Sequence, residues 1–208
     1  MSYFEISNCF LHAASLSAEI KRFRIERLAA LLEDNTGMFG VIHVVPASFT
    51  NPADSLPMCD LCKAGRIPIS RKLNEYIRGR MYPNVDGVWF PSDDESRDFQ
   101  LFRLFNNGSV ELKCNLYTTK SMNEEYLVSA EFIQAIDDIV EGTAEIYKAL
   151  GRKATVYVCV SLLECKGYWN YVSGVSVHPA ASKIDRDRIL CEPIEIKDIS
   201  DGGKKLLQ

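Results

Sequence analysis

Hydrophobic residues recur along the chain at two spacings, and each spacing predicts a type of element. Spacings of three and four predict an amphipathic helix over residues 15–33, with the apolar side chains Leu16, Ile20, Phe23, Leu28, Leu31 and Leu32. The same spacing predicts a second long helix over residues 123–150. Asn123 is its expected N-cap, and Gly151 follows its last turn.

Extended segments show shorter hydrophobic runs. "GVIHVVP", residues 40–46, is rich in β-branched residues and ends at a proline, which predicts a short buried strand. Residues 156–163 are apolar at nearly every position, so both faces of this strand are expected to be buried and the strand is expected to be central in its sheet.

The clearest β signal lies at residues 99–118. The turn Asn106-Asn107-Gly108 separates "FQLFRLF" from "SVELKCNLYT", and Asn-Gly between two apolar runs is typical of a hairpin. In the second run, Glu111 and Lys113 alternate with apolar residues. This alternation predicts that one face of the strand contacts solvent.

The predicted fold is α/β, a single domain over residues 1–208 with a mixed sheet, built from a central strand near 156–163, a hairpin near 99–118 and long helices near 15–33 and 123–150. A last strand is expected within residues 189–198, where Pro193 favours an edge position. Residues 1–10 and 199–208 are predicted to be mobile ends.

Composition narrows the class of protein. The 208 residues are 47% hydrophobic and 25% charged with a net charge of −4, as in an ordinary globular protein. Apolar runs are far shorter than a membrane span, and the first ten residues do not have the pattern of a secretory signal. Seven scattered cysteines do not form a secreted disulfide framework. We therefore expect a cytoplasmic protein with no membrane contact.

Motifs for catalysis are weak. "CDLC" gives Cys59 and Cys62 the spacing of half a zinc site or of a redox pair, but no second pair of ligands follows, so a coincidental pair is favoured and no metal is expected. His43 is a lone histidine on an apolar strand, which favours a hydrogen-bonded core residue over a general base. The sequence has neither a phosphate-binding glycine loop nor a nucleophile elbow. We expect no cofactor and no enzymatic activity.

One candidate nucleic-acid site lies in the basic segment 63–80. Its candidate contacts are the cations Arg66, Arg71, Lys72, Arg78 and Arg80. Tyr76 and Tyr82 interleave with them, and basic residues with aromatics can bind phosphates and stack on bases. The alternative is a solvated face that balances the acidic segments of the chain.

One candidate ligand site follows the strand at 156–163. Ligands of open α/β sheets gather beyond the carboxyl ends of strands, and Lys166, Tyr168 and Trp169 are expected near that end. A lysine beside aromatic rings can hold an anionic planar ligand. The alternative is a bend at Gly167 whose aromatics cover the core.

An ordered set of segments carries a family resemblance. The set comprises "AEIKRFRIERLAALL", "VIHVVPASF", "NVDGVWF", "FQLFRLFNNGSVE", "VSLLECKGY" and "IDRDRILCEPIEIKD". In this order it resembles the region that follows a Schlafen-AlbA domain in bacterial proteins described as ATP-binding or DNA-binding regulators. The match covers roughly residues 10–198 on pattern reading. The Glu–Phe–Lys-like strand and the Ala–Asn–Thr–Gly–Gly-like turn of the Schlafen-AlbA domain itself have no counterpart here.

The resemblance implies a non-catalytic accessory domain, for ligand sensing or protein interaction, with a Schlafen-AlbA domain in cis or in trans as its partner. The alternative hypothesis is a nucleic-acid-binding module that uses residues 63–80. The two differ in salt dependence, because phosphate contacts weaken steeply as salt rises.

Overall fold

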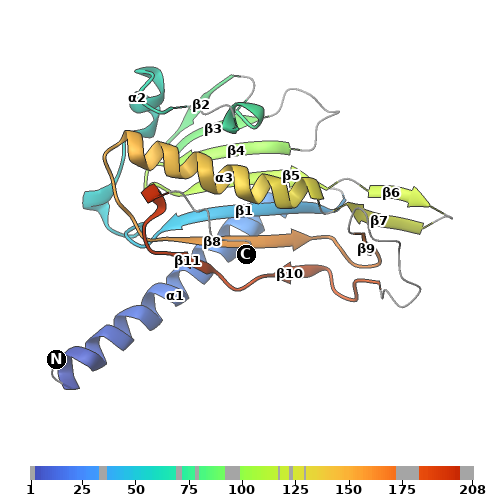
Figure 1. Ribbon diagram of the computed structural model, residues 1–208, viewed down its shortest axis with the longest axis horizontal. Coiled ribbons are helices and arrows are strands. Elements are labelled where there is room, and N and C mark those ends of the chain that lie inside the picture. Colours follow the sequence, from blue (N-terminus) through green and yellow to red (C-terminus); the bar gives the residue numbers. More distant parts are fainter. Residues whose placement is uncertain are drawn as a thin grey trace. The chain divides into compact units, whose positions relative to one another are not determined.

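The structure is a computed structural model that describes residues 3–32, 37–68, 72–77, 80–91, 99–116, 118–121, 124–128, 130–171 and 183–201 (Figure 1). Its chain divides into two compact units, Met1–Thr36 and Gly37–Gln208. Helices and an eight-stranded sheet are both present, so the predicted mixed α/β class is confirmed.

The first unit contains one helix, α1 (Tyr3–Leu32). The helix predicted over residues 15–33 is confirmed, but it begins twelve residues earlier because residues 3–14 contain neither glycine nor proline to stop it. On its surface, Arg22 forms ion pairs of 3.9 Å with Glu19 and with Glu26, at spacings of three and four residues.

The second unit is built on a large sheet in which every pairing is antiparallel. Its strands follow one another in the order β10 (Arg188–Leu190), β8 (Val156–Leu163), β1 (Phe39–Pro46), β5 (Val110–Asn115), β4 (Phe99–Phe105), β3 (Gly87–Pro91) and β2 (Tyr82–Asn84). A further strand, β11 (Ile194–Ile196), pairs with β8 beside β10.

The predicted strand at residues 156–163 is confirmed with those bounds, and it is an interior strand between β1 and the edge formed by β10 and β11. The edge position predicted for the last strand is also confirmed. Residues 191–193 divide that edge into two short strands, because Pro193 has no N–H to donate to β8. The opposite edge, β2, contains Pro83.

The predicted hairpin is confirmed as β4 and β5, which pair from Phe99↔Cys114 to Leu104↔Val110. Gly108 has a φ of +85°, a conformation that favours glycine, and the Asn107 side chain accepts a hydrogen bond from the Ser109 N–H at 3.0 Å. Local turn chemistry therefore fixes this hairpin.

The first part of the predicted helix 123–150 is wrong. Glu124–Val128 forms strand β7, which pairs antiparallel with β6 (Thr118–Ser121) and parallel with β9 (Trp169–Tyr171) in a second, three-stranded sheet. The helix itself, α3, is Ala130–Ala149. Two glutamates suit the start of a helix locally, but the pairing partner β9 lies about forty residues away in sequence, and local periodicity cannot register it.

Helix α3 lies across one face of the large sheet (Figure 1). Its residues Ile139 and Ile146 are fully buried, together with Ile42 and Leu112 from the sheet. Gly40 is required beneath the helix, since a Cβ there would lie 2.3 Å from the Phe132 ring.

Short helices complete this unit: η1 (Pro52–Asp54), α2 (Met58–Lys63), η2 (Leu73–Glu75) and η3 (Ile199–Asp201). Only η2 represents the helical turn that the sequence favours within residues 70–81. Ile199 is fully buried in the core, so the chain is anchored past the predicted start of the mobile C-terminal end.

The solvated face predicted for β5 is wrong, because Glu111 and Lys113 are buried. The Glu111 carboxylate lies 3.0 Å from His43 Nε2 and 3.6 Å from an Arg103 guanidinium nitrogen on the two neighbouring strands. Lys113 lies 4.8 Å from the centre of the Phe39 ring. Charges that pair across strands can occupy a buried face, and alternation alone does not distinguish this case from a wet one.

Candidate functional site

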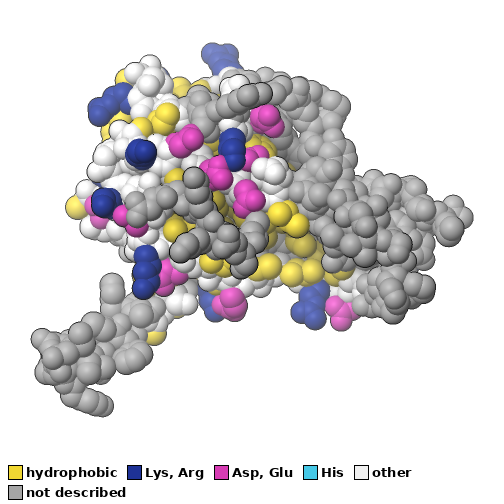
Figure 2. All heavy atoms as spheres, in the orientation of Figure 1, with side chains coloured by type: hydrophobic (Ala, Val, Ile, Leu, Met, Phe, Trp, Pro, Cys, Tyr) yellow, Lys and Arg dark blue, Asp and Glu magenta, His cyan; other side chains and the backbone are white. Residues whose placement is uncertain are grey.

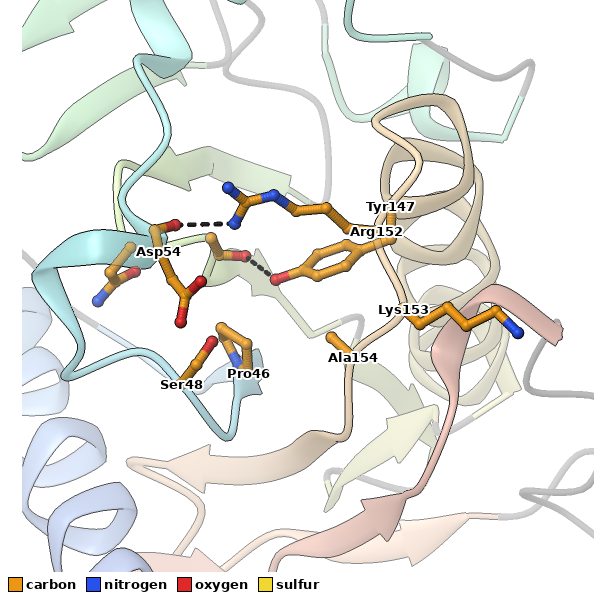
Figure 3. Close-up of a pocket in the computed structure, with 9 residues that line it drawn as sticks. Pro46, Ser48, Asp54, Tyr147, Arg152, Lys153 and Ala154 are labelled. Carbon is orange, nitrogen blue, oxygen red and sulfur yellow. Dashed lines mark hydrogen bonds between the residues drawn. The ribbon is translucent and has the colours of Figure 1, made fainter.

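A pocket of about 270 Å³ opens at the end of the large sheet where β1 finishes and β8 starts, next to the register pair Pro46↔Val156. Antiparallel pairing brings three connections to this end of the sheet: the turn after β1, the β4–β5 turn and the segment between α3 and β8. The pocket is lined by Pro46, Ser48, Asp54, Asn107, Gly108, Tyr147, Arg152, Lys153 and Ala154 (Figure 3).

Arg152 is positioned by the end of α3. Gly151, at a φ of +65°, follows the helix, and the Arg152 N–H donates to the Tyr147 carbonyl oxygen at 2.9 Å. The Arg152 Nη1 group then donates to the Asp54 backbone carbonyl oxygen at 2.9 Å, which holds the guanidinium over the pocket (Figure 3). Lys153 points away from the pocket and lies 3.9 Å from the Asp198 carboxylate.

Tyr147 forms the inner wall. Its side chain is 4% exposed, and its hydroxyl donates to the Gly108 carbonyl oxygen at 3.1 Å. Burial raises the pKa of the Tyr147 hydroxyl well above its usual range, the Arg152 charge lowers that pKa, and the Asp54 charge raises it. The hydroxyl therefore keeps its proton, and two opposite charges both act on it.

Asp54 supplies the negative charge. In η1, the Asn51 amide nitrogen donates to Asp54 Oδ2 at 2.9 Å, which orients the half-buried carboxylate. Within the described residues, no ion pair joins this carboxylate to Arg152, whose guanidinium contacts only the Asp54 backbone. Figure 3 shows the carboxylate directed to the other side of its own backbone from the guanidinium. Positive and negative groups thus face one pocket without neutralising each other.

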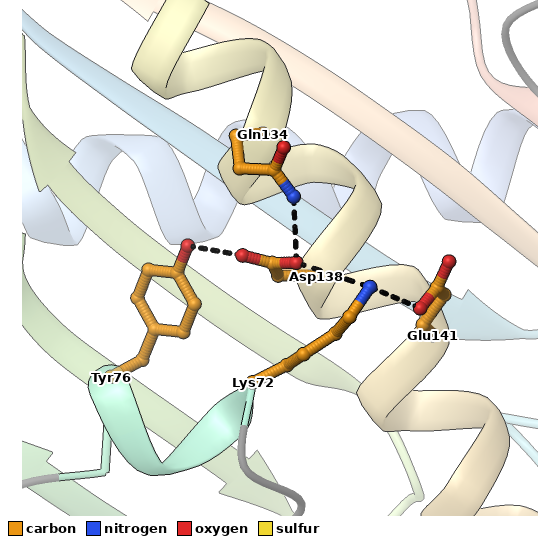
Figure 4. A network of polar contacts seen from close by, with 5 residues as sticks. All are labelled: Lys72, Tyr76, Gln134, Asp138 and Glu141. Atoms are coloured by element: carbon orange, nitrogen blue, oxygen red, sulfur yellow. Dashed lines mark hydrogen bonds and ion pairs between the residues drawn. The ribbon is translucent and has the colours of Figure 1, made fainter.

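A second polar cluster lies along the middle of α3 (Figure 4). Lys72 forms ion pairs with Glu141 and, at 3.5 Å, with Asp138. Asp138 also accepts hydrogen bonds from the Tyr76 hydroxyl at 3.2 Å and from the Gln134 amide at 2.9 Å. We call these five residues the Lys72 cluster.

Electrostatics in the Lys72 cluster are internally balanced. The hydrogen bond to Glu141 raises the pKa of Lys72, and burial, followed by the Asp138 charge, raises the pKa of Tyr76. Burial also raises the pKa of the neighbouring Asp137 carboxyl. Every member of the cluster has a partner within the protein, so the cluster fastens the η2 segment to α3.

The residues predicted as a ligand site lie at the opposite end of β8 from the pocket. Lys166 is exposed, while Tyr168 is half-buried and packs against the core. Gly167, at a φ of +91°, makes the bend between them. Trp169 begins β9, and its side chain lies outside the described part of the structure.

The reasoning behind that prediction does not suit this sheet. Ligands gather at the carboxyl ends of strands where the strands are parallel, because those ends then share one edge. The large sheet here is antiparallel throughout, so carboxyl and amino ends alternate along both of its edges. The site at Lys166, Tyr168 and Trp169 therefore stays a prediction without support from this topology.

The predicted nucleic-acid residues are not brought together into a charged surface. Arg66 and Arg80 are exposed, Lys72 is paired with carboxylates, and Arg71 and Arg78 lie outside the described residues. In the described part of the face in Figure 2, basic and acidic side chains are interspersed. Nucleic-acid binding through residues 63–80 thus stays a prediction that rests on Arg66 and Arg80.

Cys59 and Cys62 are half-buried thiols on α2. Burial, followed by the charge of Cys59, raises the pKa of Cys62 to about 11, so this thiol is protonated at neutral pH. Across the described ranges, no three His, Cys, Asp or Glu side chains are grouped closely enough to hold a metal ion. The hydrogen-bonded core role predicted for His43 is confirmed by its contact with Glu111.

The sequence stage missed the pocket residues, which come from five short segments that look like ordinary turns. The signal was present in the polar turn after residue 46 and in "GRK", residues 151–153, before β8. Both adjoin strands that were predicted, and antiparallel pairing of those strands would have placed them together.

Comparisons with known proteins identify no family. No family model, curated protein or solved structure matches the chain. The resemblance to the region that follows a Schlafen-AlbA domain therefore stays a prediction. None of the helices described here is long and apolar enough to cross a lipid bilayer.

Proposed function

We propose that residues 37–208 form a non-catalytic module that binds a small polar ligand in the pocket between Asp54 and Arg152. One observation carries this proposal: the two side chains present opposite charges to one pocket and do not pair with each other. Unmatched charge at a partly desolvated surface is costly to keep unless a ligand matches it. This function agrees with the ligand-sensing role that the sequence resemblance implies.

The chemistry of the lining residues suits binding better than catalysis. Arg152 carries a permanent charge, and Tyr147 holds its proton because its pKa is raised. Ser48 lines the pocket, but none of the residues that line it is a histidine or a cysteine, so Ser48 has no general base beside it there. These groups can orient and desolvate a ligand without transferring a proton.

The proposal is tested by titrating the whole chain with a panel of small charged molecules, including amino acids, carboxylates, amines and phosphates, under calorimetry. We expect at least one class to bind, and we expect Arg152→Gln to weaken that binding at least tenfold. Arg66→Gln is the matched control, because Arg66 is equally cationic and exposed away from the pocket. Binding by no member of the panel, or equal binding by both variants, would overturn the proposal.

We propose further that a Schlafen-AlbA domain, in cis or in trans, receives the signal of ligand binding. Support for this partner comes from the order of the sequence segments alone. The intact mass of the native chain and of its tightest partner, measured from the source cells, tests it. A longer chain or a partner with the Schlafen-AlbA strand and turn is expected, and a partner without them would contradict the proposal.

A further inference from the structure

The arrangement of charge in the pocket specifies the ligand more narrowly than its polarity does. On one side, the Arg152 guanidinium commits one nitrogen to the Asp54 carbonyl oxygen. A guanidinium has five N–H donors in a planar fork, so this bond fixes its plane and leaves a pair of parallel donors for a carboxylate.

On the other side, the Asp54 carboxylate accepts one hydrogen bond through Oδ2, from the Asn51 amide. A carboxylate has about four acceptor positions, so most of its capacity remains for a cationic donor. An ammonium group fits this role because it carries three N–H donors and a full positive charge.

The two charges are held apart by the protein itself. Arg152 reaches the Asp54 backbone, the Asp54 carboxylate is directed away from the guanidinium, and Asn51 keeps the carboxylate in that orientation (Figure 3). The opposed effects of Arg152 and Asp54 on the pKa of Tyr147 place both charges near the same buried hydroxyl. A ligand that matches both must itself carry two opposite charges a short distance apart.

Size sets a further limit. Sites for drug-sized molecules have volumes of about 300–1,000 Å³, whereas this pocket has about 270 Å³. The hydroxyl of Ser48 and the side chain of Asn107 line the remaining wall, so the ligand is small and polar.

We propose that the pocket binds a small zwitterion of the α-amino acid class, with the ligand carboxylate on Arg152 and the ligand ammonium on Asp54. This inference rests on the proposed function and names its ligand class. A phosphate ester fits less well, because the Asp54 carboxylate repels a dianion and the second nearby cation, Lys153, points away from the pocket.

The test uses the full chain and calorimetric titration with glycine and L-alanine, alongside three partial mimics: acetate, methylamine and inorganic phosphate. We expect at least one of the two amino acids to bind at least tenfold more tightly than acetate or methylamine. Asp54→Asn should abolish its advantage over acetate, whereas Arg152→Gln should abolish binding of both. Asp54→Glu, which restores the charge, should recover part of the advantage.

Asp60→Asn is the matched control, because Asp60 is an exposed aspartate on α2 that does not line the pocket. Thermal melts of each variant show whether it is folded. The zwitterion assignment is overturned if acetate or phosphate binds as tightly as both amino acids and Asp54→Asn leaves that binding unchanged. That result keeps the proposed function, because the pocket still binds a ligand. Absence of binding by the amino acids and by every class in the wider panel overturns both.

Discussion

Two clusters of charged residues lie along α3, and they differ in where their charges are satisfied. In the Lys72 cluster, a lysine meets two carboxylates, and the buried one of these, Asp138, also accepts hydrogen bonds from Tyr76 and Gln134. In the pocket, Arg152 turns to a backbone carbonyl and leaves the Asp54 carboxylate unmatched. The first cluster is a fastening between elements, and the second is a surface prepared for something else.

Packing explains the difference. The η2 segment is pressed against α3 so closely that a Cβ on Gly142 would lie 2.2 Å from Leu73, and this contact brings Lys72 within reach of the helix carboxylates. Arg152 lies instead in a connection after the helix, and its main restraint is one hydrogen bond to η1. The comparison predicts that changes in the Lys72 cluster reduce stability, whereas changes of pocket charge reduce binding.

The largest loss of stability is expected for Asp138→Ala. The Tyr76 hydroxyl then stays buried without its acceptor, and Lys72 loses one of its two carboxylates, which together should lower the free energy of unfolding by about 2–3 kcal/mol. Urea denaturation measures the loss. Glu145→Ala, at an exposed position of the same helix, is the control and should change stability by less than about 0.5 kcal/mol. Equal effects of the two variants would contradict the fastening role.

A smaller loss is expected for Gly142→Ala, which forces η2 away from α3. Overpacking against the buried Leu73 side chain costs about 1–3 kcal/mol, and the better helix propensity of alanine offsets part of that cost. The net loss should be about 1–2 kcal/mol in urea denaturation. Leu73→Ala in the same background should remove part of the penalty of the second change, since the clash is then relieved; strict additivity of the two losses would refute this contact.

Tyr147→Phe should cost about 1 kcal/mol, because the Gly108 carbonyl oxygen loses its hydrogen-bond donor while the ring still fills the inner wall of the pocket. This residue belongs to the pocket but acts through a satisfied bond, so it sharpens the comparison from the other side. Denaturant unfolding and ligand titration are measured on the same variant. A variant that keeps its stability and loses binding would show that the hydroxyl contacts the ligand instead.

Arg152→Gln and Asp54→Asn should each change the free energy of unfolding by less than about 1 kcal/mol, because these charges do not pair with each other in the folded protein. Thermal melts without ligand measure this effect. A loss as large as that of Asp138→Ala would mean that the pocket charges are structural, and the contrast between the clusters would disappear.

The smallest effect is expected for nucleic acid. Only Arg66 and Arg80 of the predicted contacts are exposed in the described part of the chain, so binding of a single-stranded oligonucleotide should be weak, with a salt dependence of about one to two released counterions. Fluorescence anisotropy at several salt concentrations measures the slope. Tight binding with a steep slope that Arg80→Gln reduces would instead support the module predicted from residues 63–80.

The elements that could be predicted from sequence are those fixed by local chemistry. The Asn-Gly turn specified the hairpin, the apolar run specified β8, and Pro193 specified an edge. Strand β7 was mistaken for the start of a helix because its partner β9 comes about forty residues later in sequence. The buried Glu111 was expected in solvent because its partners lie on neighbouring strands.

The pocket could not be predicted because no single segment carries its pattern. Ser48, Asp54 and Arg152 each occupy an ordinary polar turn, and only the antiparallel register of β1 with β8 brings those turns to one end of the sheet. The Lys72 cluster was equally hidden, and there the sequence favoured phosphate contact for a lysine that the fold had already paired.

Both edges of the large sheet contain a proline. Pro83 occupies the middle of β2, and Pro193 separates β10 from β11. An edge strand recruits another chain through an unbroken row of N–H and C=O groups, and proline removes a donor from that row. The sheet is therefore protected at both edges against strand-by-strand growth into fibrils, even where Leu190 and Ile194 leave apolar side chains exposed beside one edge.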